Sequence, residues 1–416
     1  MSSPVFLTCR KSVTLNDYDS TIVKRNLVKD AVQVACFSLH RRIPDRPKTV
    51  KGVVMAYTMR DVAKLAGVST ATVSRVLNQT HYRSAATEKR VLQVVHKLKY
   101  YKNVHARRLS TGQSDLFGLV ISEIANPFFA EVIKGFQGAA WDLGFDVLLF
   151  NTEYIEGRTQ SVIRKLVESD VRGVAIMTSS IENEMAKGLT QAGIGVVFSN
   201  LGHAGRLISN VSIDYKRGIL QAIEHLAALG HRRAAVISGP ATNRTALHIR
   251  EALVAGLTQR GMEPLLTTNS NYRVDAGASA VREILNAPCI PTVIFCGSDL
   301  IALGAMTALE EAGVNIPQDV SIVGIDDISF AGLARPPLTT IRVPREDLGA
   351  TAFEALQRML KLKRERGSEY SLETELVIRK STAPARKWKL QLEKGRLKSL
   401  APARKPATSP GDRSRA

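Results

Sequence analysis

Features that mark secreted, membrane-bound or metal-binding proteins are scarce in this sequence. Its four cysteines, Cys9, Cys36, Cys289 and Cys296, form no CxxC pair and no metal-ligand spacing, so reduced thiols without a metal site are expected. No apolar run approaches the roughly 20 residues of a membrane-spanning helix. The short apolar stretch 31–39 precedes His-Arg-Arg instead of a small-residue cleavage site, which argues against export. These absences favour a cytoplasmic protein with no membrane partner.

Catalytic signatures are missing as well. The chain has no GxSxG nucleophile elbow, no Walker phosphate loop, no HExxH zinc motif and no GxGxxG after a predicted strand. Each of these motifs places a nucleophile, a phosphate or a metal where chemistry can occur. The sequence therefore disfavours an enzyme, nominates no catalytic residue and predicts no cofactor.

Acidic residues are fewer than basic ones, 38 against 57, and the net charge of +19 is unevenly distributed. Residues 57–112 carry a net +9, whereas the longer stretch 113–378 carries −6. A small basic segment attached to a mildly acidic body suits contact with nucleic-acid phosphates, because each neutralised phosphate releases counterions. The net charges of +6 over residues 1–56 and +10 over residues 379–416 are interpreted as solvated charge.

Residues 58–77 have the pattern of two short helices about a tight turn. Thr58 is a favourable N-cap with Asp61 three residues on. Gly67 permits a sharp turn before Ser69, which can cap a second helix. Helical spacing assigns these apolar side chains to a core: Val62, Ala63, Leu65, Ala66, Val73, Val76 and Leu77. The pattern predicts a helix-turn-helix whose second helix can enter a DNA major groove.

A third helix is expected after Ser84, with Val91, Val94, Val95 and Leu98 at core spacing. The run DVAKLAGVSTATVSRVLNQ, this third helix and the residues after it resemble the DNA-binding headpiece and hinge of the lactose/galactose repressor family. The resemblance spans more than fifty consecutive residues and continues to about residue 383. It implies a regulator that binds double-stranded DNA as a homodimer.

From residue 116 onward, short apolar runs alternate with amphipathic stretches of helical length. The expected strands are 116–121, 145–150, 173–177, 195–199, 234–238, 292–296 and 321–325. This alternation is typical of an α/β fold with parallel sheets, in which ligands bind outside the carboxyl ends of the strands. The segments NPFFAEVIKG, CGSDLIALGAMTALEEAG and LTTIRVPREDLGATA resemble the family's effector-binding body, a two-lobed fold shared with periplasmic sugar-binding proteins.

The expected organisation has five parts. Residues 1–56 are an unstructured leader or precede the true start. Residues 57–101 form the helix-turn-helix domain, and residues 102–113 form a hinge helix and linker. Residues 114–383 form the effector-binding and dimerisation domain, and residues 384–416 are a disordered basic tail, because they are rich in Pro, Ser and Ala and poor in core formers.

The resemblance assigns DNA contacts to the second helix and the hinge. Arg75 is the candidate for a bidentate contact to guanine, and Thr70 and Ala71 occupy positions that select operator bases in the family. Polar residues that would hold phosphates are Thr58, Ser69, Thr72, Ser74 and Asn78. For Thr58 and Ser69 the alternative is simple helix capping. In the hinge, the resemblance implies minor-groove contacts by Asn103, Ala106, Arg107 and Leu109, with Leu109 as the apolar wedge.

The resemblance also nominates an effector site between the lobes. Its expected residues are Phe128, Phe129, Asn200, Thr245, Tyr272, Ser298 and Asp326. The aromatic residues would stack on a ring, and Asp326 would accept hydrogen bonds, although an Asx-turn is its alternative role. Family members that bind sugars or purines present an arginine where this chain has Ile249. The expected effector is therefore a small, polar, largely uncharged molecule, sugar-like in chemistry, without a phosphate or carboxylate group at that end.

The leading hypothesis is a transcriptional repressor that binds a pseudo-palindromic operator and responds to a small molecule. One alternative is a regulator controlled by a protein partner, with a vestigial cleft. Another is a pure ligand-binding module of the periplasmic type, which the headpiece pattern and the missing export signal argue against.

Overall fold

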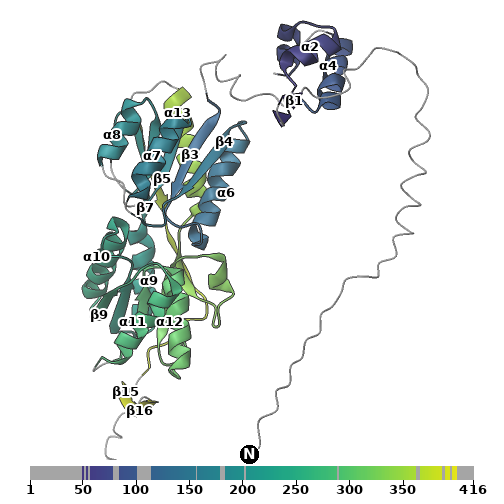
Figure 1. Ribbon diagram of the computed structural model, residues 1–416. Coiled ribbons are helices and arrows are strands. Elements are labelled where there is room, and N and C mark those ends of the chain that lie inside the picture. The colour runs from purple at the N-terminus through teal and green to yellow at the C-terminus, as the bar shows by residue number, and fades with distance from the viewer. Residues whose placement is uncertain are drawn as a thin grey trace, which may run out of the picture. The chain divides into compact units, whose positions relative to one another are not determined.

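The computed structural model divides into two compact units, residues 1–107 and 108–416 (Figure 1). Each unit is described by itself. Within the described residues, no helix is long and apolar enough to cross a membrane. The described residues are 49–50, 53–54, 57–77, 84–100, 114–155, 157–178, 183–200, 203–287, 290–361, 366–386, 389–393 and 396–400.

The described residues of the first unit form three helices, α2 (Met59–Ala66), α3 (Thr70–Leu77) and α4 (Ala85–Leu98). Thr58 and Asp61 form the expected capping box, in which the Thr58 amide donates to an Asp61 carboxylate oxygen at 2.8 Å. Gly67 ends α2 in the left-handed region at φ 64°, where a residue without a Cβ is favoured.

The core of this unit matches the predicted apolar face with one correction. Its buried side chains are Val62, Ala63, Ala66, Val73, Val76 and Val91. Leu77 and Leu98 pack against them in partly buried positions. Leu65 is 42% exposed and is not a core residue. It lies between the two buried turns of α2, where the helix face has already rotated away from the core.

Two short strand pairs lie in the segments that were expected to be unstructured near the two ends of the chain. In the leader, β1 (Thr49–Val50) pairs antiparallel with β2 (Val53–Val54). In the basic tail, β15 (Lys389–Glu393) pairs antiparallel with β16 (Arg396–Leu400). Alternation of Leu with polar residues at 389–393 is a strand pattern, and the low overall hydrophobicity of the tail obscured it.

The second unit has two lobes, each built on a six-stranded sheet (Figure 1). All pairings in the first sheet are parallel. Its strands, in spatial order, are β13 (Glu369–Glu373), β7 (Ile208–Asp214), β6 (Gly195–Ser199), β5 (Gly173–Met177), β3 (Leu116–Ile121) and β4 (Asp146–Asn151). The helices of this lobe are α6 (Pro127–Trp141), α7 (Arg158–Glu168), α8 (Asn183–Gln191) and α13 (Arg345–Lys361).

The second sheet is parallel except for one edge strand, which runs antiparallel to its neighbour. Its strands, in spatial order, are β14 (Glu375–Val377), β12 (Thr339–Arg342), β11 (Ser321–Asp326), β10 (Val293–Cys296), β8 (Arg233–Ser238) and β9 (Glu263–Asn269). Its helices are α9 (Tyr215–Ala228), α10 (Arg244–Gln259), α11 (Val274–Leu285), α12 (Asp299–Glu311) and the short 3-10 helix η1 (Ser329–Gly332).

The described chain passes between the lobes three times, after β7, after β12 and between β13 and β14. Thr374 joins the first and third passages. Its buried hydroxyl donates to the Asp214 carbonyl at 2.6 Å and accepts from the Gly218 amide at 3.0 Å. These hydrogen bonds hold the first and third passages together, and so fix the junction between the two sheets.

All seven expected strands are present, and β4 begins one residue later than predicted. The sequence did not predict β7, β9, β13 or β14 as strands. These are mixed polar and apolar segments, and β13 alternates between exposed and half-buried positions. Such a short alternating pattern is a poor predictor of a strand, because the strand forms only through pairing with a buried neighbour.

We predict that Gly135→Ala destabilises the first lobe, by about 1–3 kcal/mol in the free energy of unfolding. Helices α6 and α13 approach so closely that a Cβ at Gly135 would collide with the backbone carbonyl of Glu346. The matched control is Gly138→Ala in the same helix, where a Cβ meets no atom within 4 Å. That control should be neutral or slightly stabilising, because alanine favours helices. Urea denaturation of both variants checks this, and equal midpoints would contradict the close packing.

Candidate DNA interface and effector pocket

Helix α3 presents a small polar face outside the core of the first unit. Thr70, Ala71 and Arg75 are exposed, whereas Val73 and Val76 are buried on the opposite side. This division follows the helical period, which brings every third or fourth residue to the same face. The exposed side therefore carries the two small candidate base-contacting residues and the candidate guanine-binding arginine.

Capping accounts for part of the polar set. The Ser69 hydroxyl accepts from the Thr72 amide at 3.2 Å, so Ser69 caps α3. Thr58 caps α2 and is exposed, and Thr72 and Ser74 are half-buried. Phosphate contacts by these four residues stay predictions. The remaining candidates lie outside the described residues: Asn78, Asn103, Ala106, Arg107 and Leu109.

A pocket of about 100 Å³ lies between the two lobes of the second unit, at the carboxyl ends of their strands. This is smaller than the ~300–1,000 Å³ of ordinary ligand sites, so it suits a compact molecule. The sequence placed Ser298 here, but its hydroxyl accepts from the Ile301 amide and caps α12, and the neighbouring Gly297 lines the pocket instead. The six other predicted residues line it: Phe128, Phe129, Asn200, Thr245, Tyr272 and Asp326.

Aromatic rings form much of the pocket wall. Asn126 caps α6 by accepting from the Phe128 amide at 3.0 Å, which fixes where Phe128 and Phe129 emerge. Their rings meet edge to face with centroids 5.2 Å apart, and Phe129 is the more buried. From the other lobe, the Tyr272 ring lies against Gly239, where any Cβ would strike it. The glycine makes room for the ring.

Sequence reasoning missed two tyrosines and several smaller lining residues. Tyr154, in the loop after β4, and Tyr215, at the start of α9, both line the pocket. Burial raises the pKa of Tyr154 to about 12 and raises the pKa of Tyr215 further. Their position could have identified them, because both follow a strand of the first sheet. The smaller polar lining residues are Ser122, Asn126, Thr178, Ser199 and Asn243.

Ile249 lines the pocket at the position where the family resemblance would place an arginine. Its side chain is 5% exposed and lines the cavity. The flanking Arg244 and Arg250 do not line it, and Arg250 instead donates to the Asn269 side chain at 3.3 Å. Arg250 is one residue along α10, which rotates its side chain by about 100°, and Arg244 is five residues back, at about 140° from Ile249 around the helix. Both guanidiniums therefore point away from the cavity.

Two buried carboxyl groups lie side by side at the base of the pocket. Asp326 ends β11 with φ 117°, and Asp299 begins α12. Asp299 accepts from the Thr340 hydroxyl at 2.6 Å and from the Ile328 amide at 2.8 Å. Burial raises the pKa of Asp299 to about 7 despite these donors. Burial and the neighbouring Asp299 likewise raise the pKa of Asp326 well above its usual range.

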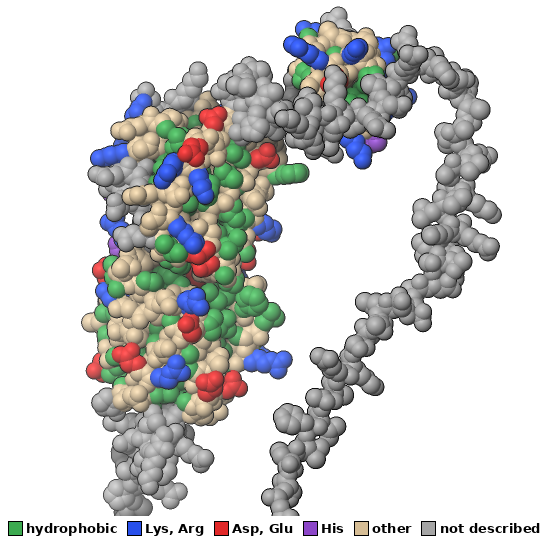
Figure 2. All heavy atoms as spheres, in the orientation of Figure 1, with side chains coloured by type: hydrophobic (Ala, Val, Ile, Leu, Met, Phe, Trp, Pro, Cys, Tyr) green, Lys and Arg blue, Asp and Glu red, His purple; other side chains and the backbone are tan. Residues whose placement is uncertain are grey.

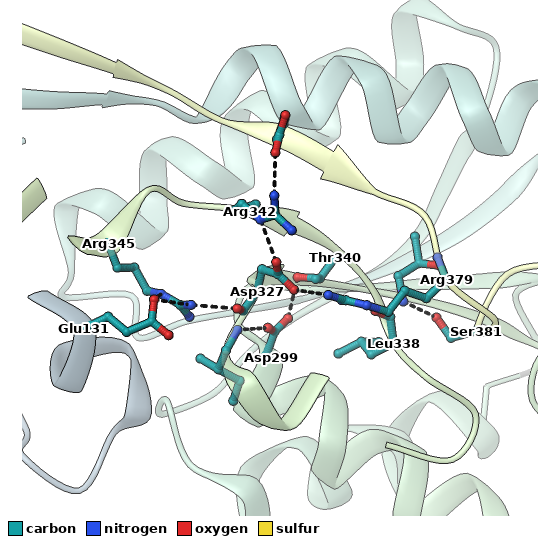
Figure 3. Close-up of polar contacts among 12 residues, drawn as sticks. Glu131, Asp299, Asp327, Leu338, Thr340, Arg342, Arg345, Arg379 and Ser381 are labelled. Carbon is teal, nitrogen blue, oxygen red and sulfur yellow. Dashed lines mark hydrogen bonds and ion pairs between the residues drawn. The ribbon is translucent and has the colours of Figure 1, made fainter. Parts of the chain in front are cut away.

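The next carboxylate, Asp327, is fully paired. It accepts from Arg342 at 2.7 Å and from Arg379 at 2.6 Å (Figure 3). Arg345, at the start of α13, donates to the Asp327 carbonyl at 2.7 Å and to Glu131 of α6 at 2.8 Å. Arg345 thereby connects helices α6 and α13 of the first lobe to the strand end of the second lobe, beside the pocket.

The Asp299 carboxyl predicts a stability that falls as pH rises from about 4 to about 7. The folded group keeps its proton up to about pH 7, whereas an unfolded aspartate releases it near ~4. The folded state thus binds more protons across this window, and one such proton gives a slope of about 1.4 kcal/mol per pH unit. Denaturation midpoints at several pH values should show a smaller decline for Asp299→Asn than for the parent chain. Parallel profiles would contradict the assignment.

Comparison with known proteins covers both units. Residues 58–103 match the family described as "Bacterial regulatory proteins, lacI family", and residues 223–382 match a "Periplasmic binding protein-like domain". The HTH-type transcriptional repressor PurR of Photobacterium profundum is 34% identical over 331 residues, which is 78% of this chain and 98% of that protein. PurR of Vibrio vulnificus is 32% identical over 333 residues, covering 77% of this chain and 97% of that protein.

Solved structures show the same architecture. The lac repressor dimer bound to operator and the anti-inducer ONPF is 28% identical, with a TM-score of 0.72, covering 79% of this chain and all of that chain. A complex of the transcriptional regulator CelR with cellobiose is 30% identical, with a TM-score of 0.59, covering 78% of this chain and 99% of that chain. The chain is therefore a member of the lacI family of bacterial regulatory proteins, with a helix-turn-helix unit and a two-lobed periplasmic-binding-protein-like body.

Proposed function

We propose that this chain is a sequence-specific transcriptional repressor that acts in the bacterial cytoplasm by binding rather than by catalysis. Two copies bind a pseudo-palindromic operator, because two-fold protein symmetry imposes two-fold symmetry on the DNA site. The observation that carries the proposal is the coexistence, in one chain, of the exposed polar face of α3 and an aromatic pocket between two lobes. The PurR relatives are named as repressors of this type.

The homodimer is supported by apolar side chains exposed on the second unit. Trp141 and Leu143, at the end of α6, are 79% and 51% exposed, and Leu333, after η1, is 75% exposed. Figure 2 shows hydrophobic side chains gathered over the α6 side of this unit. Exposed large apolar residues of this kind mark interaction surfaces. The related lac repressor was solved as a dimer on its operator.

Control by an effector follows from where the pocket lies. Its walls belong to both lobes, and Arg345 connects the lobes beside it. A ligand that contacts both walls stabilises one relative arrangement of the lobes over another, and a second site gains or loses affinity by the same free energy. The expected coupling to DNA binding is about 1–3 kcal/mol, or roughly 5- to 150-fold in affinity.

Arg75→Ala should relax the preference at one base pair in each half of the operator, at a cost of about 1–3 kcal/mol. Its guanidinium is the only charged group on the exposed face of α3. Binding-site selection with random DNA measures the preference at each position. The control, Arg90→Ala on the exposed side of α4, should weaken binding without altering the consensus. An unaltered consensus for Arg75→Ala would remove this residue from the base-reading set.

The regulatory role predicts that a molecule bound in the pocket changes operator affinity at fixed salt. The affinity of the full chain for its selected operator would be measured by fluorescence anisotropy, with and without each compound that binds. Tyr272→Ala should lose this response while keeping operator affinity, because Tyr272 lines the pocket and lies in the other unit from α3. Operator binding that no pocket ligand alters would support the protein-partner alternative instead.

A further inference from the structure

The pocket combines a large aromatic surface with a single acidic group. Five aromatic rings line it: Phe128, Phe129, Tyr154, Tyr215 and Tyr272. Among the described lining residues, Asp326 is the only Asp or Glu, and none is Lys, Arg or His. Aromatic faces carry partial negative charge, so rings around a carboxylate favour a positively charged group.

The charges behind the pocket wall do not balance. Three guanidiniums, those of Arg342, Arg345 and Arg379, lie among five carboxyl groups, those of Glu131, Asp299, Asp326, Asp327 and Glu375. The guanidiniums are paired with Asp327, Glu131 and Glu375. The two remaining carboxyl groups, Asp299 and Asp326, form no ion pair in the part of the chain that the structure describes. The Arg345 guanidinium attracts both, but its hydrogen bonds go to Glu131 and to the Asp327 carbonyl, and the Asp299 amide donates to the Asp326 carboxylate.

Protons and ligands are the two ways to neutralise such a pair. Asp299 is wholly buried, accepts two protein hydrogen bonds and does not line the cavity, so a proton is its natural partner. Asp326 is 9% exposed and does line the cavity. An ionised carboxylate buried without a partner is costly, and a cation placed in the cavity would remove that cost.

We infer that the pocket selects a small organic cation, an ammonium group carried on a compact or ring-shaped skeleton. The ammonium lies against Asp326 and the aromatic rings, and its apolar part lies toward Ile249 and Leu348. This inference rests on the proposed function of the pocket as the effector site. The inferred ligand class differs from the neutral sugars named for two solved relatives, the CelR–cellobiose complex and a LacI family regulator with bound ribose.

The test compares ligands that differ only in charge. Isothermal titration of the full chain would use choline against its uncharged carbon isostere dimethylbutanol, and benzylamine against benzyl alcohol. Ribose and cellobiose serve as neutral sugars. At least one of the two cations, choline or protonated benzylamine, should bind roughly tenfold or more tightly than its uncharged partner, because the cation–π and carboxylate contacts are both desolvated. A preference for the alcohols or the sugars, or no binding by either amine, would overturn the inference.

Two variants test which residues produce the preference for a cation over its uncharged isostere. Asp326→Asn should bind the amine and its isostere about equally, whereas the control Asp142→Asn, exposed at the end of α6, should keep the preference. Tyr154→Leu offers an independent check, because Tyr154 is 42% exposed and its loss should reduce the choline preference several-fold without unfolding the chain. A preference unchanged in Asp326→Asn would contradict the role of the carboxylate.

The inference and the proposed function can fail separately. An amine that binds with the expected selectivity but leaves operator affinity unchanged would support the cation site and defeat the effector role. A neutral sugar that binds in the pocket and changes operator affinity would do the reverse. Anisotropy measurements on the same operator, with the same ligands and with Asp326→Asn, distinguish these outcomes.

Discussion

The junction between the two lobes is the constraint on which the rest of the second unit depends. Apart from β14, the strands of each sheet are parallel and end at one edge, and the chain crosses to the other lobe at that edge. Thr374 ties the first and third crossings, and Arg345 ties α13 and α6 to the end of β11. The junction therefore brings the loop residues of both sheets to the same place, and the pocket is the space left among them.

The same junction explains why acidic groups gather there. Asp299, Asp326 and Asp327 lie at a strand end or a helix start, where backbone amides can meet carboxylates. Asp327 is satisfied by Arg342 and Arg379, so it holds structure. Asp326 has no such partner and lines the cavity. Asp327 and Asp326 therefore differ in role although they are neighbours: Asp327 is paired with arginine and holds structure, whereas Asp326 has no such pairing and is the proposed binding residue.

The pocket residue Asp326 is next to the contacts that connect the two lobes. Asp326 and Asp327 are adjacent, and the carbonyl of Asp327 accepts from Arg345, whose side chain also binds Glu131 of the first lobe. Helices α6 and α13 are locked together at Gly135, where no larger residue fits. Arg345 and this helix pair therefore provide the physical connection through which the proposed effector would act on the first lobe.

The sequence by itself determined the class of fold, both units and most of the site. Capping residues such as Thr58 and Ser84 and the turn at Gly67 act locally, so their structure follows from neighbours in the chain. Short apolar runs located the seven core strands, because burial on both faces demands continuous apolar sequence. Six of the seven residues that the family resemblance nominated for an effector site line the pocket, as does Ile249, where the chain departs from that family.

Only the tertiary structure decided what depends on distant partners. The strands β7, β9, β13 and β14 have mixed polarity and become strands through pairing. Ser298 is a cap rather than a lining residue, because its hydroxyl is committed to the Ile301 amide. Tyr154 and Tyr215 join Tyr272 from separate loops. The unpaired state of Asp326 depends on where three arginines lie, and these are 16 to 53 residues further along the chain. Charge balance in a buried site is a property of the assembled fold, so no local pattern in the sequence records it.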